Sequence, residues 1–314
     1  MRAYLLTRLL LTLPVLVGVS LVSFTILHVT GGDPARIMLG QEARPEDVSA
    51  LRRTLGLDAP ILVQYGWFVG RALRGDLGRS LTYRQPVRQM LGQRLPTTLM
   101  LTGVALALSV AASLPLGVAA ALRRGTGVDA AAMFVALLGV SAPTFWVALM
   151  LIFCFAYKLR WLPAAGLPGP STGGAAVLAH LLLPGSTLAL ASAALIARMM
   201  RSNLLEVLHR DFMRTARSKG LAPRQVLARH AVRNALIPTV TVVGLQLGTL
   251  LGGTVVTETV FALPGVGRLA VDAIQARDFP VVQGVVLVVA VAVTGANLLV
   301  DLAYGLLDPR ISYG

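Results

Sequence analysis

Few residues of this chain have the type and spacing that catalysis would need. A phosphate-binding loop requires a Gly-Lys pair, because the lysine reaches the terminal phosphates, and no such pair occurs. A Gly-x-Ser-x-Gly motif, in which a strained turn exposes a nucleophilic serine, is also missing from the sequence. Ser141, Ser192 and His180 do not form a recognisable catalytic set. We therefore predict no catalytic residue, no cofactor-binding or metal site and no enzyme activity in this chain.

Ionisable groups inside apolar runs are a second possible source of chemistry, because such groups mark ion sites and proton relays. Glu258 lies near the outer end of one apolar run and Asp301 near the inner end of another. Gln246 and Asn297 are the strongest uncharged polar groups in these runs. Glu258 could equally be an interfacial carboxylate that caps a helix or meets Arg268, and Asp301 is better explained as a juxtamembrane charge. A carrier coupled to protons or sodium should have carboxylates near mid-membrane, so the pattern argues against one.

One local pattern suggests a partner: a polar segment that holds nearly a third of the basic residues. Residues 211–219 suit a short helix, which Gly220 ends because glycine readily adopts the left-handed conformation. Pro223 suits the first turn of a second short helix, which runs to Ile237 before Pro238 begins the next span. The two helices are expected to form a rigid elbow against the membrane.

The first helix of this elbow is expected to present two different faces. One face carries Phe212, Thr215 and Ala216, and another carries Arg210, Arg214 and Arg217. Such a basic segment could hold anionic lipid headgroups, at about 1 kcal/mol per basic residue. A small Thr-Ala surface that ends in glycine is a poor lipid anchor but suits a groove on another protein. On the residues alone, the two interpretations stay equally open.

The elements that carry these residues are long apolar runs. The 314-residue chain is 55% hydrophobic and only 13% charged, with a mean hydropathy of +0.73, whereas soluble domains have about 25% charged residues. Six runs are long enough for a helix to cross a hydrocarbon core of about 30 Å. They cover 9–29, 98–122, 130–157, 180–200, 237–262 and 281–307. We therefore predict an all-α integral membrane protein with six transmembrane helices, which excludes an ordinary soluble enzyme.

The basic residues predict how these helices are oriented. A net charge of +14 would indicate a nucleic-acid partner in a soluble protein, but here the basic residues lie between apolar runs, so no such partner is predicted. With a cytoplasmic N-terminus, half of the 28 Lys and Arg residues lie on each side. Ten of the outer ones belong to the long segment 30–97, and long segments cross the membrane regardless of charge. Leaving that segment out gives four outside against 14 inside, which predicts that both termini are cytoplasmic.

The long segment 30–97 is predicted to be an extracytoplasmic cap with its own helices. One helix is expected from Pro45 to Gly56 and another from Pro60 to Gly75, because proline favours the first turn and glycine the end of a helix. Apolar residues recur at helical spacing in the second of them. The segment should therefore pack as a cap, unlike a flexible linker.

Motifs along the whole chain resemble one family. Residues 215–221 and 229–238 look like the EAA loop of the dipeptide/oligopeptide/nickel branch of ABC-importer permeases. The other matching motifs are Gly32-Asp33-Pro34, Leu55-Gly56-Leu57-Asp58, Gly75-Asp76-Leu77-Gly78, Arg94-Leu95-Pro96-Thr97-Thr98, Thr257-Glu258 with Phe261 and Pro264-Gly265, Asn297-Leu298 with Asp301 and Tyr304, and Leu307-Asp308-Pro309-Arg310. Phe212 departs from the usual Tyr, and Ala222 from a Ser-type cap. Each motif alone is weak evidence for the family, but seven motifs in the order and spacing of the family are strong evidence.

This resemblance implies a type I ABC-importer permease fold in a prokaryotic plasma membrane. The first span and the helical insert would occupy 1–94 and a five-helix core 95–314, with the EAA coupling loop at about 201–238. The implied partners are a second homologous permease, two cytoplasmic ATPases that bind ATP and Mg, a solute-binding protein outside, and membrane lipid. The implied ATPase-coupling residues are Asp211, Arg214, Thr215, Ala216, Arg217, Lys219 and Gly220. The residues expected at the pathway or its outer mouth are Gln246, Glu258, Phe261 and Pro264.

The resemblance implies an ATP-driven importer permease that couples to its ATPases through the EAA loop. An ion-coupled secondary carrier or a channel that no ATPase powers is the alternative, and an intramembrane hydrolase would need paired catalytic groups within the spans. Related scaffolds are associated with dipeptides, longer peptides, glutathione-like peptides and nickel chelates. The lack of metal-ligand spacing favours di- or oligopeptides as cargo.

Overall fold

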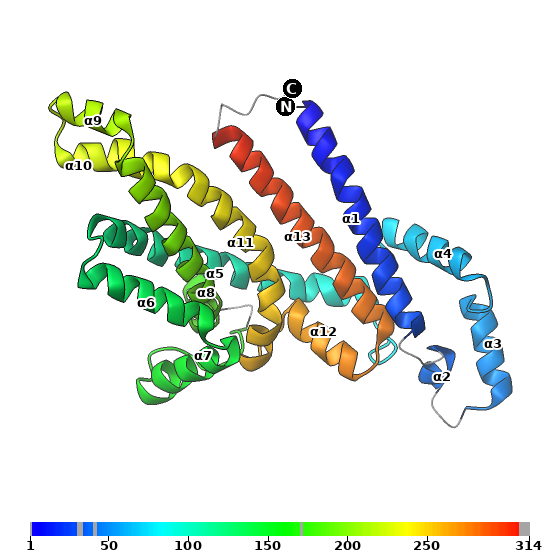
Figure 1. Cartoon of the computed structure of the whole chain (residues 1–314). Coiled ribbons are helices and arrows are strands. Elements are labelled where there is room, and N and C mark those ends of the chain that lie inside the picture. The colour runs from blue at the N-terminus through cyan, green and yellow to red at the C-terminus, as the bar shows by residue number, and fades with distance from the viewer. Residues whose placement is uncertain (1, 30–33, 40–42, 170–171, 308–314) are drawn as a thin grey trace. The chain divides into compact units, whose positions relative to one another are not determined.

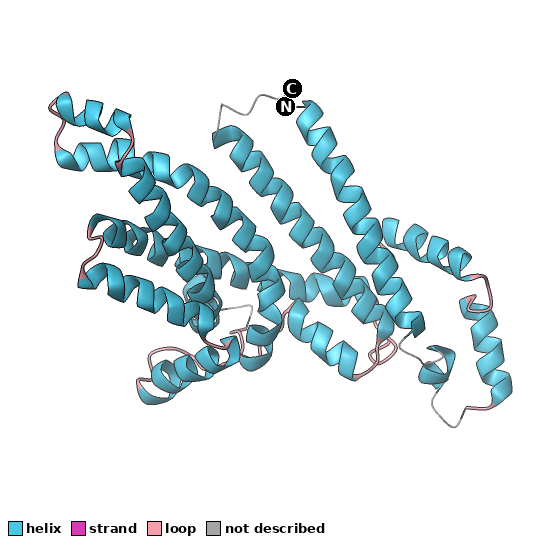
Figure 2. Ribbon diagram, viewed as in Figure 1, coloured by secondary structure: helices cyan, strands magenta, loops and turns pink. Residues whose placement is uncertain are grey.

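The computed structural model describes residues 2–29, 34–39, 43–169 and 172–307. Among these residues the regular structure is helical, apart from one antiparallel bridge between Arg79 and Pro86 (Figures 1 and 2). The prediction of an all-α chain is therefore confirmed. The chain divides into two compact units. The first unit comprises Met1–Pro96 and Gly265–Ala292, and the second comprises Thr97–Pro264 and Val293–Gly314.

These units differ from the predicted division at 94/95 in one segment. The first break, between Pro96 and Thr97, lies within two residues of the predicted boundary. Gly265–Ala292, however, packs with the first unit although it was expected in the second domain. The reason is an apolar cluster that combines side chains far apart in the chain. Its buried members are Val87, Met90, Leu91, Val266, Leu269, Ala273, Val281 and Val285.

The first unit contains the predicted insert and its helices. Its elements are α1 (Arg2–Val29), α2 (Pro34–Leu39), α3 (Pro45–Leu55), α4 (Ile61–Leu73), the first residues of α5 (Val87–Leu122), α12 (Val266–Gln275) and the first half of α13 (Phe279–Leu307). Gly56 ends α3 at φ 69° and Gly75 follows α4 at φ 76°, so the predicted helix ends are confirmed. The Gln64 amide fixes the turn between them by donating to the carbonyl oxygens of Leu57 (3.0 Å) and Ala59 (2.8 Å). The motif residues 32–33 and 308–310 lie outside the described residues.

A buried carboxylate ties the end of the insert to the turn between α12 and α13. Asp278 is fully buried and accepts a hydrogen bond from the Ser80 hydroxyl. It also accepts bonds from the backbone N–H groups of Leu81 and Thr82, each at 3.1 Å. Because a buried carboxylate is stable only when its oxygens are hydrogen-bonded, these contacts hold the two turns together as one body.

The second unit contains the remaining helices. They are the rest of α5, α6 (Gly127–Ser141), α7 (Thr144–Leu151), the π-helix η1 (Ile152–Lys158), α8 (Gly174–Leu208), α9 (Asp211–Ser218), α10 (Pro223–Gln225), the π-helix η2 (Val226–Val232), α11 (Arg233–Val260) and the end of α13. Glycines let these helices approach closely. A Cβ on Gly117 of α5 would lie 2.7 Å from the carbonyl oxygen of Ala197 on α8. Small residues are the usual means of helix packing in membranes.

Several described helices are long and apolar enough to cross a membrane. Four qualify as single helices: Val87–Leu122, Gly174–Leu208, Pro223–Val260 and Phe279–Asp301. A bent pair, Gly127–Ser141 with Thr144–Lys158, makes five if it counts as one span. Within α1 the apolar helix Leu10–Thr25 is shorter. Helices long and apolar enough to cross a membrane thus occur at four or five of the six predicted runs, and the count of six spans stays a prediction.

The third run, predicted as one span over 130–157, is broken, and this prediction is wrong in detail. Helix α6 ends at Ser141 and α7 begins at Thr144, with an angle of 109° between them. Ala142 is extended, at φ −75° and ψ 132°, because a residue before proline is pushed out of the helical region. Pro143 cannot donate a backbone hydrogen bond either, so the helix stops here.

An ion pair joins α6 to α8 and gives a first testable prediction. The Arg201 guanidinium donates to both carboxylate oxygens of Asp129, at 2.6 and 2.7 Å, and the side chains are 25% and 9% exposed. Arg201→Gln should lower the free energy of unfolding by about 2 kcal/mol, between the values for exposed and buried pairs. Arg198→Gln, an exposed arginine on the same helix, should change it by less than about 0.5 kcal/mol.

Thermal unfolding in detergent would measure both variants and the double variant Asp129→Asn/Arg201→Gln. We expect the double variant to lose less stability than the two single losses combined, because neither partner is left unpaired. Strictly additive losses would show that the pair contributes no coupling.

Candidate functional site

The predicted basic elbow is formed by α9 and the turn that follows it. Helix α8 ends at Leu208, and α9 begins at Asp211, whose carboxylate lies in the first turn, where the helix dipole favours negative charge. Gly220 has φ 75°, and its N–H donates to the carbonyl oxygen of Arg217 at 3.0 Å. A side chain at this position would be strained. The predicted short helix and its glycine stop are confirmed.

Two side chains hold α9 against the helix bundle. Met213 is 1% exposed and Ala216 is 7% exposed. Both belong to a buried cluster, here named the base cluster, whose members are Ala121, Met200, Leu204, Val207, Met213, Ala216, Val226, Ala231 and Ala235. The base cluster therefore joins α9 to the ends of α5 and α8 and to the start of the following helix.

The predicted faces of α9 need one correction. Ala216 was expected beside Phe212 and Thr215 on an outward face, but it is buried while the other two are exposed. The physical reason is the spacing of three between Met213 and Ala216, which places both on the inner side of one helical turn. Ala216 thus packs inside the chain, and the coupling role implied for it stays a prediction.

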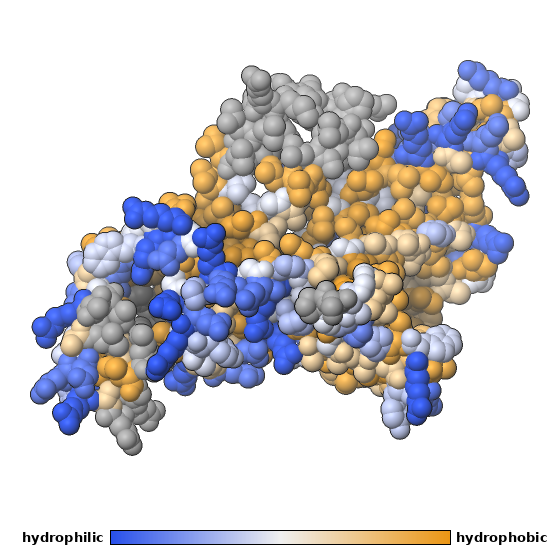
Figure 3. Space-filling model, turned by 180° about the vertical axis from the view of Figure 1, so that it is seen from behind, coloured by the Kyte–Doolittle hydropathy of each residue, from blue (hydrophilic) through white to orange (hydrophobic). Residues whose placement is uncertain are grey.

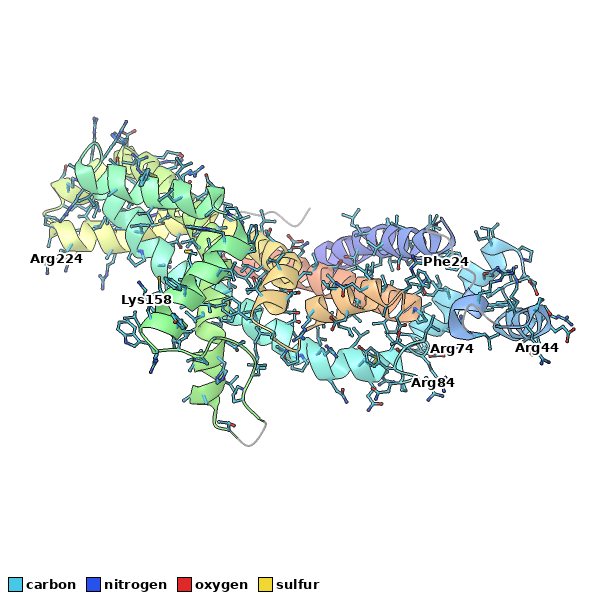
Figure 4. The ribbon with its side chains drawn as sticks, turned by 90° about the horizontal axis from the view of Figure 1, so that it is seen from below. Phe24, Arg44, Arg74, Arg84, Lys158 and Arg224 are labelled. Atoms are coloured by element: carbon cyan, nitrogen blue, oxygen red, sulfur yellow. The ribbon has the colours of Figure 1, made fainter. Side chains whose placement is uncertain are left out.

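The outer face of α9 is basic, with one aromatic side chain. The exposed residues of α9 and of the turn that follows it are Asp211, Phe212, Arg214, Thr215, Arg217, Ser218, Lys219 and Gly220. Figure 3 shows hydrophilic side chains gathered at the tip formed by α9 and α10, at the upper right, and Arg224 of α10 is labelled in Figure 4. The surface thus combines cations with a partly exposed ring, which fits a partner groove that has an acidic rim. Six of the seven predicted coupling residues lie on it.

The second helix of the elbow differs from the prediction. It does not end before the span: α10, η2 and α11 run on as one helical rod, Pro223–Val260, and Pro238 lies inside α11. Membrane helices tolerate proline because neighbouring groups satisfy the freed backbone. The part of the elbow that follows the Gly220 turn is thus continuous with a helix long and apolar enough to cross a membrane.

Hydrogen bonds join α8 to α11 above the base cluster. The Asn203 amide donates to the Thr239 hydroxyl at 3.1 Å, and that hydroxyl donates to the carbonyl oxygen of Ala235 at 2.8 Å. Further along, the Ser192 hydroxyl donates to Oε1 of Gln246 at 2.9 Å, and both side chains are buried. These bonds make α8 and α11 a connected pair.

The residues predicted at the pathway or its outer mouth are mostly enclosed. Glu258 is 0% exposed and accepts a hydrogen bond from the Thr98 hydroxyl at 2.7 Å. Phe261 is buried, and its carbonyl oxygen accepts from the N–H of Gly166 at 2.8 Å. Gln246 is buried as well, and of the four predicted residues Pro264 alone is exposed. This chain itself covers these three side chains, and their place at the pathway or its outer mouth stays a prediction.

Sequence reasoning missed several residues that organise this site. Met213 carried a usable signal, its spacing of three from Ala216. Nothing in the sequence indicated that Asp129 and Arg201 form a pair, because they are 72 residues apart. The described residues contain no group of three or more His, Cys, Asp and Glu side chains placed to hold a metal ion.

Two family models match the chain. The model described as "Binding-protein-dependent transport system inner membrane component" matches residues 113–313, and the model of the N-terminal part of such components matches residues 1–102. The chain is 43% identical to the dipeptide transport system permease protein DppB of Alkalihalophilus pseudofirmus, with 100% of each covered. It is 41% identical to DppB of Escherichia coli, with 100% of this chain and 99% of that protein covered. A putative peptide transport system permease protein of Brucella abortus is 43% identical, with 100% of each covered.

Solved structures agree on the fold. The methionine ABC transporter MetNI, in a crystal form with inward-facing conformations, matches with a TM-score of 0.57 and 20% sequence identity, over 70% of this chain and 97% of that chain. A second MetNI crystal form matches with a TM-score of 0.54 and 19% identity, over 70% and 97%. The family models and the full-length relatives lead to one conclusion: this chain belongs to the family of binding-protein-dependent transport system inner membrane components.

Proposed function

We propose that the chain is a permease subunit of an ATP-driven ABC importer for di- or oligopeptides. The observation that carries this proposal is α9: a short helix with a basic outer face, anchored inside by Met213 and Ala216. The sequence contains no Gly-Lys pair with which to bind ATP by a phosphate-binding loop, so partner subunits would bind ATP and Mg and hydrolyse the ATP. The full-length relatives named as dipeptide or peptide permeases support the class of cargo.

The proposed assembly has this chain as one of two similar permeases. Two ATPases would bind on the cytoplasmic side, and a solute-binding protein would dock on the insert outside. In this arrangement α1 is the first of six spans and the bent pair of α6 and α7 is the third. The charge count supports cytoplasmic termini and an extracytoplasmic insert.

The proposed mechanism is alternating access driven from α9. When the ATPases close, their groove would displace α9. Because the base cluster packs α9 against α8 and the rod Pro223–Val260, a tightly packed contact would transmit this displacement as a rigid-body movement. The hydrogen bond between Ser192 and Gln246 would keep α8 and α11 moving together. Work done on the cytoplasmic side would then open and close the membrane pathway.

The outer charges of α9 give the direct test of ATPase docking. Arg214→Gln/Arg217→Gln should weaken copurification of the ATPases about tenfold, because two partly exposed ion pairs together contribute about 1.4 kcal/mol. ATP-dependent uptake of a radiolabelled dipeptide into proteoliposomes should fall in parallel. Arg123→Gln/Arg124→Gln is the matched control, since it removes two exposed charges from the same predicted side of the membrane.

Two results would contradict the proposal. One is equal loss of ATPase binding in the control and in the α9 variant. The other is dipeptide accumulation driven by a proton or sodium gradient without ATP, which would indicate an ion-coupled carrier.

A further inference from the structure

An arginine-lined pocket lies in the insert, between α3 and α4. The pocket has a volume of about 620 Å³ and is open to the surface. Its lining combines three arginines, three glycines and one tryptophan: Arg53, Gly56, Gly66, Trp67, Gly70, Arg71 and Arg74. No carboxylate belongs to this lining. The pocket is separate from α9 and from the other residues assigned above.

The three guanidinium groups of this pocket carry uncompensated positive charge. Arg53, Arg71 and Arg74 are exposed, and none forms an ion pair among the residues that the structure describes. Arg52, the neighbour of Arg53, differs because its Nε donates to Asp58 at 3.1 Å. Arg71 lies in the last turn of α4, and Arg74 directly follows the end of that helix. Three guanidinium groups that line one pocket can together hold an anion such as a phosphate.

The glycines shape the wall of the pocket. Gly56 ends α3 in the left-handed conformation, and a Cβ there would lie 2.6 Å from the Trp67 ring, so glycine lets the ring pack against the backbone. At Gly66 and Gly70 a Cβ would meet nothing within 4 Å. The space that larger side chains would fill is therefore open beside the indole ring. A tryptophan at the edge of an apolar surface is typical of the boundary between membrane and water.

The rest of α4 indicates that this boundary is a membrane surface. Leu62 is 79% exposed and Leu73 is 84% exposed. At 100° per residue, Arg71 lies on the side of α4 roughly opposite these leucines. An exposed apolar side opposite a basic side is the pattern of a helix that lies in the membrane interface.

Contacts with α1 place α4 beside the apolar helix Leu10–Thr25. The Tyr65 hydroxyl is 2.8 Å from the Ser20 hydroxyl, and the rings of Tyr65 and Phe68 lie 5.4 and 5.8 Å from that of Phe24. Ser20 and Phe24 belong to the apolar helix Leu10–Thr25. Phe24 and Arg74 are labelled in Figure 4. Since a helix with side chains is about 10–12 Å across, leucines in the acyl region leave Arg71, on the opposite side of α4, at the level of the headgroups.

We propose that this pocket binds the headgroup phosphate of an anionic phospholipid. The phosphate would lie between Arg53, Arg71 and Arg74, the headgroup would contact the indole of Trp67, and the acyl chains would extend past the leucine side of α4. The exposed leucines favour a lipid over an acidic protein surface, which would leave them in water. This site depends on the insertion of α4 into the interface, and its test can fail without affecting the proposed transport function.

The first measurement is the amount of phosphatidylglycerol that stays bound to the full chain in native mass spectrometry. Arg53→Gln/Arg71→Gln/Arg74→Gln should reduce this binding about tenfold or more, because each basic residue near anionic lipid contributes about 1 kcal/mol. The control is Arg44→Gln/Arg79→Gln/Arg84→Gln, which removes three exposed charges of the same unit outside the pocket. Its lipid binding should stay at the wild-type level, and equal loss in both variants would overturn the proposal.

The second measurement uses the fluorescence of Trp67, one of three tryptophans, in a Trp146→Phe/Trp161→Phe background. In nanodiscs, phosphatidylglycerol with a spin label on its headgroup should quench Trp67, and the arginine variant should lose this quenching. Quenching by aqueous iodide alone would place the pocket in water and overturn the proposal in favour of an acidic protein partner. Displacement of the lipid by millimolar inorganic phosphate would overturn it in favour of a site for small anions.

Discussion

Replacing Met213 by alanine is expected to lower ATP-driven peptide uptake about tenfold or more, while the chain stays in the membrane and keeps its ATPases. Met213 is 1% exposed and is one of two buried side chains of α9. Truncation of a buried methionine costs about 2–5 kcal/mol, and about 1.4 kcal/mol already changes an equilibrium tenfold. Helix α9 should therefore spend much of its time detached from the base cluster. A displacement of detached α9 no longer moves α8 or α11.

The measurement compares uptake of a radiolabelled dipeptide into proteoliposomes with copurification of the ATPases. The outer face of α9 is unchanged in this variant, so copurification should stay within about twofold of wild type. Met100→Ala is the matched control, because this methionine is 43% exposed on α5 and its truncation leaves no cavity. Wild-type uptake by the Met213 variant would show that packing of α9 does not transmit the work.

Replacing Gly244 by alanine is expected to destabilise the contact between α11 and α13. The new Cβ would lie 2.1 Å from Cγ1, 2.8 Å from Cγ2 and 3.0 Å from Cβ of Val300, and a rotation of the valine side chain would leave the Cβ contact in place. Such overpacking costs about 1–3 kcal/mol, so the midpoint of thermal unfolding in detergent should fall. Val300→Ala removes both clashing methyl groups and should restore part of the loss in the double variant.

Gly252→Ala is the control on the same helix. A Cβ at Gly252 would meet nothing within 4 Å, so this variant should be neutral or up to about 1 kcal/mol more stable, since alanine favours helix. Equal stability of the two alanine variants would contradict the close packing at Gly244, and so would a lack of rescue by Val300→Ala.

Local rules made the helix ends of this chain predictable. Gly56, Gly75 and Gly220 all have positive φ, as the end of a helix followed by glycine requires. Proline was less decisive, because Pro184 and Pro238 lie inside helices whereas the helix breaks at Pro143. An apolar run contains no information about whether packing will support a proline. The break in the third run could therefore not be predicted from its length and composition.

The pairing of the helices could not be predicted in the same way. Thr98 and Glu258 are 160 residues apart, and Ser192 and Gln246 are 54 apart. A helix that is apolar all round presents many faces, so its polar residues do not reveal their partners. The candidate site was predictable in part, less so than the helix ends and more so than the pairing of the helices. The α9 segment and most of its outer residues followed from the sequence, whereas the inward position of Ala216 depended on which side met the base cluster.

The central claim is that α9 receives work from ATPases on the cytoplasmic side. Cross-linking from α9 tests this claim most directly. Ser218 is exposed on α9, and Cys154, the single cysteine of the chain, can be changed to serine. In the assembled transporter, Ser218→Cys in a Cys154→Ser background should cross-link to an ATPase subunit, with a yield that changes when ATP is added. No cross-link to an ATPase, with or without ATP, in a transporter that still accumulates peptide would contradict the account.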